Sequence, residues 1–274
     1  MYNLSLGASC GGEYYPVNRK LFETYAANGI WNIEISQYHR LLRDCNWQEI
    51  KKASQNSGVA VWSFHLPYAG FDIAVPDKRE RSNTIKYQRE YISVAAELGA
   101  RYCVIHPGGG IFPEIGRSEE LNIAKESLAL LAEHAQREGT VIAVENLPRT
   151  CLGNTVQEMS DIISCDERLK VCFDVNHILQ GTHREFMETL GKEIVTLHIS
   201  DYDFVDERHW LPGKGKINWV ELMDLLGKVE YSGCFMYEID LRPEDEDSPD
   251  LIARTTYQEL VQNYNKLMEC PRCL

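Results

Sequence analysis

Short apolar runs alternate with longer amphipathic segments along the whole chain, and this alternation restricts the possible folds more than any other feature. Eight runs are predicted as strands, at residues 4–6, 30–35, 59–64, 102–105, 141–144, 171–173, 194–197 and 234–237. Each precedes a segment with helical spacing of apolar residues, at 19–28, 47–56, 79–98, 119–138, 155–164, 184–190, 219–226 and 250–268. Near-continuous apolar strands that alternate with helices predict a parallel sheet covered by helices.

The length of the chain indicates how such a sheet is arranged. Eight strand–helix units within 274 residues favour a closed (β/α)8 TIM barrel, an α/β fold, over an open sheet. Glycines at 29, 58, 99 and 139 each follow a predicted helix and precede a strand, where a left-handed helix cap is expected. No linker or low-complexity tract interrupts the pattern, so residues 1–274 are predicted to form a single domain.

The charge and apolar content bear on the partners of the chain. Lys and Arg number 28 against 41 Asp and Glu, so the net charge is −13, which weighs against a nucleic-acid partner. No run approaches the roughly 20 apolar residues of a membrane helix, so no membrane partner is expected. The first residues lack the basic and apolar regions of a secretory signal, so we expect a cytoplasmic protein.

The cysteines do not form the pattern of a disulfide framework. Their number is nine, which is odd, and they are scattered through apolar runs, so they are predicted to be reduced thiols. The segment Cys270-Pro271-Arg272-Cys273 is the exception, because a CxxC motif can be half of a zinc site or a redox pair. The chain has no second CxxC motif, so an exposed tail with two free thiols is favoured.

Polar residues end the predicted strands. In a barrel of this type the chemistry lies at the C-terminal ends of the strands. The residues at those ends are Glu34, His65, His106, Glu145, Asp174, His198 and Glu238, and His177 and His209 lie in the loops that follow. Crowded carboxylates repel one another unless a cation neutralises them, and carboxylate and imidazole are both ligands of divalent metals. The sequence therefore predicts a metal site at this end of the barrel.

These residues also carry a family resemblance. The segments Val144-Glu145-Asn146, Phe173-Asp174-Val175-Asn176-His177, Leu197-His198-Ile199-Ser200-Asp201 and Tyr237-Glu238 resemble, in the same order, those of the xylose isomerase-like barrel superfamily. That superfamily contains sugar-phosphate isomerases, ketose 3-epimerases, inosose dehydratases and endonuclease IV. The resemblance covers nearly the whole chain, and the segment from His209 to Trp219 fits it as well. It implies one divalent ion (Mn, Mg, Co or Zn) held by Glu145, Asp174, His198 and Glu238.

The resemblance leaves three activities open. A metal-dependent sugar or sugar-phosphate isomerase or epimerase is favoured, and an inosose-type dehydratase acting on a polyol is the first alternative. The endonuclease branch binds three zinc ions, and this chain matches its larger ligand set at His65, His106, Glu145, Asp174, His177, His198, His209 and Glu238, with Glu207 where that pattern has Asp. The net charge and the acidic run at residues 244–247 disfavour DNA docking, so we expect one ion per chain and no cleavage of abasic DNA.

The isomerase assignment predicts a role for each residue. Glu145 and Glu238 are expected to face each other across the substrate and to transfer a proton through an enediolate, one as base and the other as acid. Pure metal ligation is their alternative role. The resemblance implies that His177 contacts a substrate oxygen. His65, His106, His209 and Glu34 are also placed at the substrate. The alternative for His65 and His106 is to support the metal ligands. Glu34 has two alternatives, to bond a ligand histidine or simply to close its strand.

Two glycine-rich loops are weaker candidates for binding an anion. Gly108-Gly109-Gly110 lacks the residues that complete a phosphate-binding loop and is predicted to be a flexible rim segment. Pro212-Gly213-Lys214-Gly215 is either a tight turn or a place where amides and Lys214 meet an anionic group. The identity of the sugar, its phosphorylation and the formation of a homo-oligomer depend on loop shape and stay open.

Overall fold

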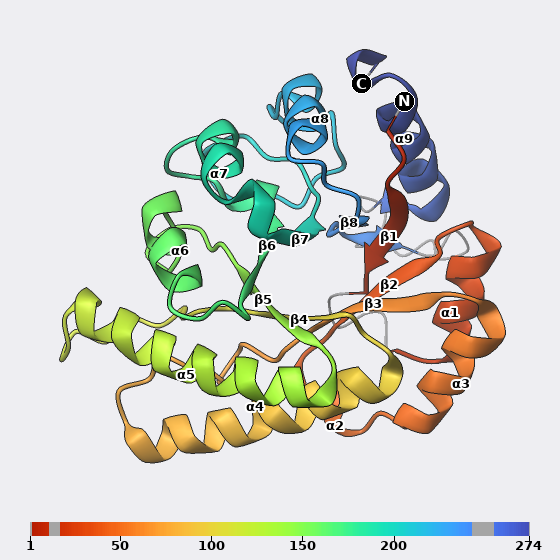
Figure 1. Cartoon of the computed structure of the whole chain (residues 1–274). Helices are drawn as coiled ribbons and strands as arrows, with labels where there is room; N and C mark the ends of the chain where they lie inside the picture. The colour runs from red at the N-terminus through yellow and green to blue at the C-terminus, as the bar shows by residue number, and fades with distance from the viewer. Residues whose placement is uncertain (1, 11–16, 243–254, 274) are drawn as a thin grey trace.

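Eight parallel strands form the centre of the computed structural model, which describes residues 2–10, 17–242 and 255–273. They are β1 Ser5–Ser9, β2 Asn32–Ser36, β3 Ala60–His65, β4 Tyr102–Ile105, β5 Val141–Glu145, β6 Lys170–Asp174, β7 Ile194–His198 and β8 Cys234–Tyr237. The sheet runs in the order β7-β6-β5-β4-β3-β2-β1-β8 (Figure 1). The acidic run at residues 244–247 lies outside the described residues.

The sheet closes just beyond the end of β7. The N–H of Ile199 donates to the carbonyl of Met236 at 2.8 Å, and the N–H of Glu238 donates to the carbonyl of Ile199 at 3.0 Å. Ile199 and Tyr237 form a parallel bridge there. The first and last strands of the order are thus joined at the end where the predicted site residues lie, and the prediction of a TIM barrel is confirmed.

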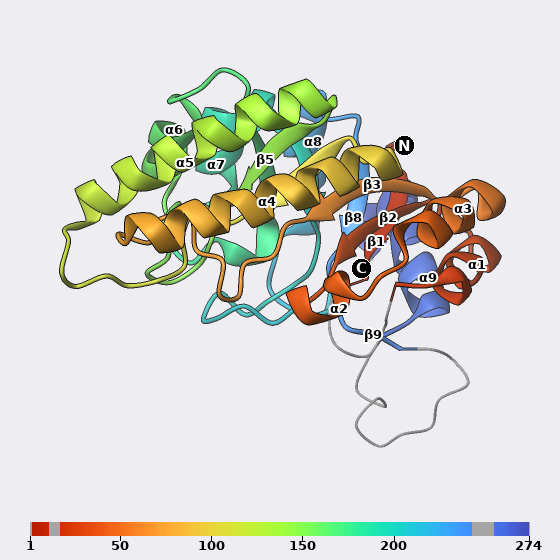
Figure 2. The same cartoon turned by 90° about the horizontal axis from the view of Figure 1, so that it is seen from below.

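Helices cover the outside of the barrel. They are α1 Arg19–Ala27, α2 His39–Arg43, α3 Trp47–Ser57, α4 Lys78–Leu98, α5 Arg117–Glu138, α6 Val156–Ile163, α7 His183–Leu190, α8 Trp219–Lys228 and α9 Tyr257–Glu269. The long helices α4 and α5 lie side by side (Figures 1 and 2). The sequence did not indicate α2, the short pair β9 Leu241–Arg242 and β10 Thr255–Thr256, or the 3-10 turns η1 Val175–His177, η2 Gly191–Glu193 and η3 Pro271–Cys273.

The helix boundaries follow from local chemistry. Thr155 precedes α6 and its side chain accepts the N–H of Glu158, while α3, α4 and α5 end at Gly58, Gly99 and Gly139. These glycines have φ of +77°, +83° and +82°, the left-handed region that glycine enters without steric cost. The caps predicted at these three glycines are confirmed, whereas α1 is capped by Asn28 and Gly29, with φ of +75°, follows it.

The interior of the barrel is filled below the site. A Cβ at Gly7 would lie 2.5 Å from the sulfur of Cys234, so only glycine fits at this point of β1. From β3, the indole N–H of Trp62 donates to the hydroxyl of Thr196 on β7 at 3.1 Å. Side chains from β1, β3, β7 and β8 thus meet in the interior beneath the strand ends.

Two further expectations concern membranes and thiols. None of the described helices is long and apolar enough to cross a bilayer. The cysteines whose side chains the structure describes are all free thiols, as predicted. Cys270 is half-buried at the end of α9, where its N–H donates to the carbonyl of Lys266, so this half of the CxxC segment is less exposed than we expected.

Candidate metal centre

The barrel brings the predicted residues together at the C-terminal ends of its strands. Glu34, His65, Glu145, Asp174 and His198 each lie within or end a strand, and His106 and Glu238 directly follow β4 and β8. The side chains of Glu34, Asp174 and His198 have no exposed surface. Parallel strands end at the same edge of a sheet, which is why residues spread over some 200 positions of sequence meet here.

Four of these residues form a group that we call the metal quartet: Glu145, Asp174, His198 and Glu238. One ligand atom from each lies within 4.8 Å of the others. The Nδ1 atom of His198 lies 3.3 Å from Glu145 Oε1, 3.3 Å from Glu238 Oε2 and 3.8 Å from Asp174 Oδ2. Among the described residues, Asp174 Oδ2 and Glu238 Oε2 are buried and find no hydrogen-bond donor. Buried carboxylate oxygens without donors are costly, and a divalent cation is the group that fits them.

Hydrogen bonds from neighbouring elements hold the quartet in place. Asn146 accepts the N–H of Asp174 and donates to its carbonyl, both at 2.9 Å. The N–H of Asn176 donates to Asp174 Oδ1 at 2.7 Å, which leaves Oδ2 for the quartet. Behind His198, Nε2 is hydrogen-bonded to Glu34 Oε2 at 3.1 Å and lies 3.0 Å from Oε1, and the hydroxyl of Ser63 donates to the same Oε2 at 2.8 Å. Of the alternatives for Glu34, the structure has the bond to a histidine of the quartet.

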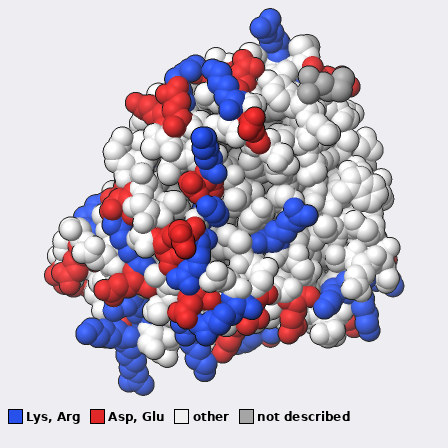
Figure 3. All heavy atoms as spheres, viewed as in Figure 1, with Lys and Arg blue, Asp and Glu red and all other residues white. Residues whose placement is uncertain are grey.

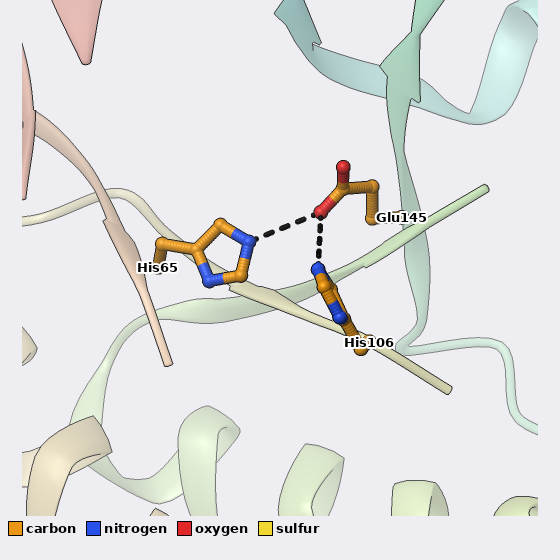
Figure 4. A group of neighbouring side chains, drawn as sticks. All are labelled: His65, His106 and Glu145. Carbon is orange, nitrogen blue, oxygen red and sulfur yellow. Dashed lines mark hydrogen bonds and ion pairs between the residues drawn. The ribbon is translucent and has the colours of Figure 1, made fainter. Parts of the chain in front are cut away.

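A second group shares Glu145, and we call it the His65 group: His65, His106 and Glu145. The Nε2 atoms of both histidines lie 3.1 Å from Glu145 Oε2, and Figure 4 shows them converging on this one oxygen. Their ligand atoms also lie close enough together to hold a metal ion. Glu145 therefore offers one oxygen to each group, Oε1 to the quartet and Oε2 to the two histidines.

His177 lies beside the quartet and both of its ring nitrogens have partners. Nδ1 lies 3.0 Å from the carbonyl of Asn146, which accepts its proton, and 3.3 Å from Asp174 Oδ2. Nε2 lies 3.1 Å from Glu207 Oε2. The ring of His209 lies 6.4 Å from that of His177, and its Nδ1 is 3.2 Å from the carbonyl of Glu238. His177, Glu207 and His209 belong to neither of the two metal-capable groups. Within the described residues they also do not form a third such group.

Burial and close contacts shift the pKa values of the buried groups in opposite directions. Burial raises the pKa of Asp174 to about 7, and the Glu238 and Glu145 carboxylates contribute to the rise. Burial also favours neutral Glu145, but His198 and His106 bring the pKa of its carboxyl well below the usual range. For His177 and His198 burial lowers the pKa, and the surrounding carboxylates more than offset this and raise it well above 6.5. The centre thus holds closely spaced groups of both charge signs.

A cavity of about 250 Å³ opens beside Glu238 and His209. Tyr38 and Tyr68 also line it, with 41% and 47% of their surface exposed, and the ring of Tyr68 stacks on His106 at 4.5 Å. Neither tyrosine was predicted from the sequence. Each follows a strand end by two or three residues, and this position was the signal that could have indicated a place at the site. Aromatic residues in loops are common, so the spacing alone did not single them out.

The two glycine-rich loops are already bonded to protein carboxylates. The N–H groups of Gly109 and Gly110 donate to Asp72 Oδ2 at 3.0 and 2.7 Å. In the other loop the N–H of Gly213 donates to buried Asp201 Oδ2 at 2.8 Å, and the Trp219 indole donates to the same oxygen at 2.9 Å. The amides that a phosphate would need are therefore occupied, and the second loop is a tight turn held by Asp201.

The charged surface shows how the net charge is distributed. On the face shown in Figure 3, basic and acidic side chains are interspersed. Arg117, at the start of α5, pairs with Glu158 at 2.7 Å, and Arg184 pairs with Glu221 at 2.5 Å. These two basic side chains of the barrel wall are thus engaged with carboxylates.

Comparisons with known proteins agree with this architecture. A family model described as xylose isomerase-like TIM barrel matches residues 22–260. The uncharacterized protein MJ1311 of Methanocaldococcus jannaschii is 31% identical over 185 residues, which cover 64% of this chain and 62% of MJ1311. The match thus spans less than two thirds of that relative's length.

Relatives with named activities are more distant. The D-psicose 3-epimerase of Ruminiclostridium cellulolyticum is 23% identical over 71% of this chain and 68% of its own. A probable endonuclease 4 of Bacillus licheniformis is 25% identical over 65% of each chain. Among solved structures, a D-tagatose 3-epimerase-like protein aligns with a TM-score of 0.78 over 97% of this chain and 98% of its own, at 22% identity, which shows a common fold.

Proposed function

Because the chain belongs to the xylose isomerase-like TIM barrel family, we propose that it is a divalent-metal-dependent sugar isomerase or epimerase. The observation that carries the proposal is the metal quartet with its two buried oxygens that lack a donor. The sugar epimerases among its relatives, the D-psicose 3-epimerase and a fructoselysine 3-epimerase of Shigella flexneri, support the same activity.

Glu145, Asp174, His198 and Glu238 would hold the ion. When bound, a divalent ion polarises a substrate carbonyl and favours the negative charge that develops on its oxygen. Glu145 and Glu238 both reach within 3.3 Å of His198 Nδ1 from opposite parts of the barrel. We assign one of them to remove the proton next to the carbonyl and the other to return a proton to the enediolate.

The histidines have supporting roles in this proposal. His65 and His106 hold Glu145 Oε2, so they fix the orientation of the acid–base group. Nδ1 of His177 is fixed by the carbonyl of Asn146, whereas Nε2 faces Glu207, which is partly exposed and belongs to a loop. Nε2 is therefore the nitrogen that can exchange its partner for a substrate oxygen. His209 lines the cavity and is assigned to the substrate.

The favoured substrate is an uncharged sugar. The cavity beside Glu238 is lined by the neutral polar side chains of Ser9, Ser36 and Gln37, by two tyrosines and by the acidic Asp240, which also disfavours an anionic substrate. Aromatic rings such as Tyr68 offer an apolar face and a polar edge, which suits the mixed surface of a sugar. Asp72 and Asp201 occupy the amides of both glycine-rich loops, which disfavours a phosphate group there.

A substrate panel tests the proposal. We expect purified protein loaded with Mn²⁺, Co²⁺, Mg²⁺ or Zn²⁺ to interconvert free ketoses, to lose this activity in EDTA and to regain it when metal is restored. The panel includes the matching sugar phosphates and inososes. Dehydration of an inosose without turnover of any ketose would assign the chain to the dehydratases instead.

A nuclease is the second candidate, because the His65 group is also able to hold an ion and endonuclease 4 is among the relatives. The acidic net charge of −13 argues against docking to DNA. We expect one tightly held ion per chain by elemental analysis and no cleavage of a duplex with an abasic site at physiological salt. Three equivalents of zinc together with metal-dependent cleavage would replace the isomerase by the nuclease.

A further inference from the structure

Arg149 joins two neighbouring carboxylates, Asp206 and Glu207, and the second of these contacts His177. Its Nη2 lies 2.6 Å from Asp206 Oδ1, and its Nη1 lies 3.1 Å from Glu207 Oε1. The other oxygen of Glu207, Oε2, lies 3.1 Å from His177 Nε2. We call Arg149, Asp206, Glu207 and His177 the Arg149 cluster. One guanidinium thus meets two carboxylates, and one of these also contacts an imidazole.

The backbone at Arg149 is held in a conformation that its residue type disfavours. Its φ is +56°, in the left-handed region, although it is not a glycine. The side-chain amide of Asn154 donates to its carbonyl, and Arg117 donates to the next two carbonyls, those of Thr150 and Cys151, at 2.7 Å each. Such backbone strain persists only where the surroundings impose it, so this loop is built to present Arg149 at this position.

The loop that carries the two carboxylates is fixed as well. Asp206 Oδ1 accepts the N–H of Glu207 at 3.0 Å, and Asp203 Oδ1 accepts the N–H of Asp206 at 3.1 Å. The N–H of Arg208 donates to Asn176 Oδ1, which ties the loop to the turn that bears His177. Both sides of the Arg149 cluster are therefore positioned before any ligand arrives.

The groups around the guanidinium are of the kind that bind divalent metals. Two carboxylates and one imidazole are a common ligand set, and Glu145, Asp174 and His198 of the neighbouring quartet are of the same types. At the Arg149 cluster, however, a permanent cation of the protein stands between the carboxylates. A guanidinium is always charged, and its planar fork satisfies two carboxylates at once.

We propose that Arg149 is a positioning residue that takes the place of a metal ion beside His177. It neutralises Asp206 and Glu207, keeps Glu207 within reach of His177 Nε2, and remains paired with Glu207 when His177 turns to another partner. The divalent ions of this chain are thereby confined to groups that contain Glu145. This role of Arg149 rests on the proposed function and explains why no further ion binds beside His177.

Counting bound zinc tests this without any activity assay. Wild-type protein and the variants Arg149→Met and Arg149→Lys are saturated with Zn²⁺, freed of unbound ion by gel filtration and analysed by mass spectrometry of the metal. We expect Arg149→Met to carry one equivalent more than wild type, because the two carboxylates beside the His177 imidazole lose their internal cation. Arg149→Lys keeps a positive charge and should stay at the wild-type number.

Two further variants show where the added ion lies. Asp206→Asn in the Arg149→Met background removes one of the ligand groups and should return the zinc content to that of wild type. Arg208→Met is the matched control, because Arg208 is in the same loop and pairs with Asp203 at 3.0 Å, a carboxylate that has no histidine among its described ion-pair partners. It should bind no additional zinc.

The same zinc content in Arg149→Met and wild type would overturn the proposal, and so would an equal gain in Arg208→Met. If Arg149→Met does not fold, Arg149→Gln, which keeps a polar side chain at this half-exposed position, is measured in its place against the same expectation. The proposed function fails separately, by the absence of ketose turnover in wild-type protein, and that result leaves the zinc comparison intact.

Discussion

Two neighbouring clusters of carboxylates and histidines balance their charges in different ways. Around Glu145 the carboxylates are buried, apart from the partly exposed Glu238, and within the described residues their ion pairs are all with histidines. In the Arg149 cluster the carboxylates lie on a partly exposed loop and pair with arginine. The side chain of Arg149 is 48% exposed, whereas that of Glu145 is 2% exposed.

The difference follows from burial. A long cationic side chain keeps its charged end hydrated at the rim, but an arginine in the dry centre of the barrel would need full desolvation. A small divalent ion delivers more charge in less space and has several carboxylate ligands at once. We therefore expect the residues around Glu145 to depend on metal and the Arg149 cluster to depend on its own arginine. The following predictions test that contrast.

The largest effect is expected from neutralising the acid–base pair. Glu145→Gln and Glu238→Gln each remove a proton-transfer group while keeping its shape, so turnover of the ketose substrate should fall by at least about 10²–10⁴-fold. Steady-state kinetics with circular dichroism as a check on folding measures this. Near-normal turnover in both variants would remove the two residues from the mechanism.

His177→Ala should have the next largest effect. If His177 bonds a substrate oxygen and not the metal, kcat should fall on the order of 10²-fold while the metal content stays at the wild-type value. Kinetics and elemental analysis on the same preparation separate these quantities. Loss of metal together with activity would place His177 among the metal ligands.

Glu34→Gln should weaken metal binding without removing a ligand. The carboxylate of Glu34 lies 3.0 Å from Nε2 of His198, and carboxylate partners of ligand histidines typically contribute about 10–100-fold to metal affinity. Competition with a chromophoric chelator gives the affinity. Ser63→Ala, which removes only a hydrogen bond to Glu34, is the control and should change it less.

The stability of the metal-free protein should fall as pH rises from 6 to 8. Burial raises the pKa of Asp174 from its usual 3.8 to about 7. Between these two pH values the folded protein keeps a proton on Asp174 that the unfolded chain has lost, so stability falls as pH rises towards 7. His177 and His198, whose pKa values are raised by carboxylates, stabilise the fold when protonated and lose this contribution as pH rises. Urea titrations should show a loss of about 1–3 kcal/mol in EDTA and a smaller one with metal bound. Equal pH dependence in both forms would contradict the metal-centre interpretation.

The smallest effect is expected in the loop that carries Asp206 and Glu207. Arg208→Met breaks an ion pair between partly exposed side chains, and such pairs contribute little because water screens them. The melting midpoint should change by less than about 2 °C, with turnover unchanged. A larger fall in the melting midpoint would mean that this loop supports the barrel, and the contrast between the two clusters would weaken.

The sequence predicted most of the fold and the composition of the site. The strand at residues 141–144 and the helix at 119–138 lie within one or two residues of their observed bounds, because their apolar periods are local properties of the chain. The seven polar residues at predicted strand ends were found for the same reason. Tyr38, Tyr68 and Arg149 were missed, because they lie in loops whose course has no sequence period.

The sequence by itself therefore determined which side chains reach the mouth of the barrel, because alternation and strand ends fix the order and direction of the elements. Only the tertiary structure decided which side chains touch. It placed Glu34 behind His198, gave the two oxygens of Glu145 to different histidines, and bonded the amides of Gly110 and Gly213 to Asp72 and Asp201. These pairings join residues from 12 to 164 positions apart, and they depend on how the barrel closes and on how each loop returns, which no local pattern encodes.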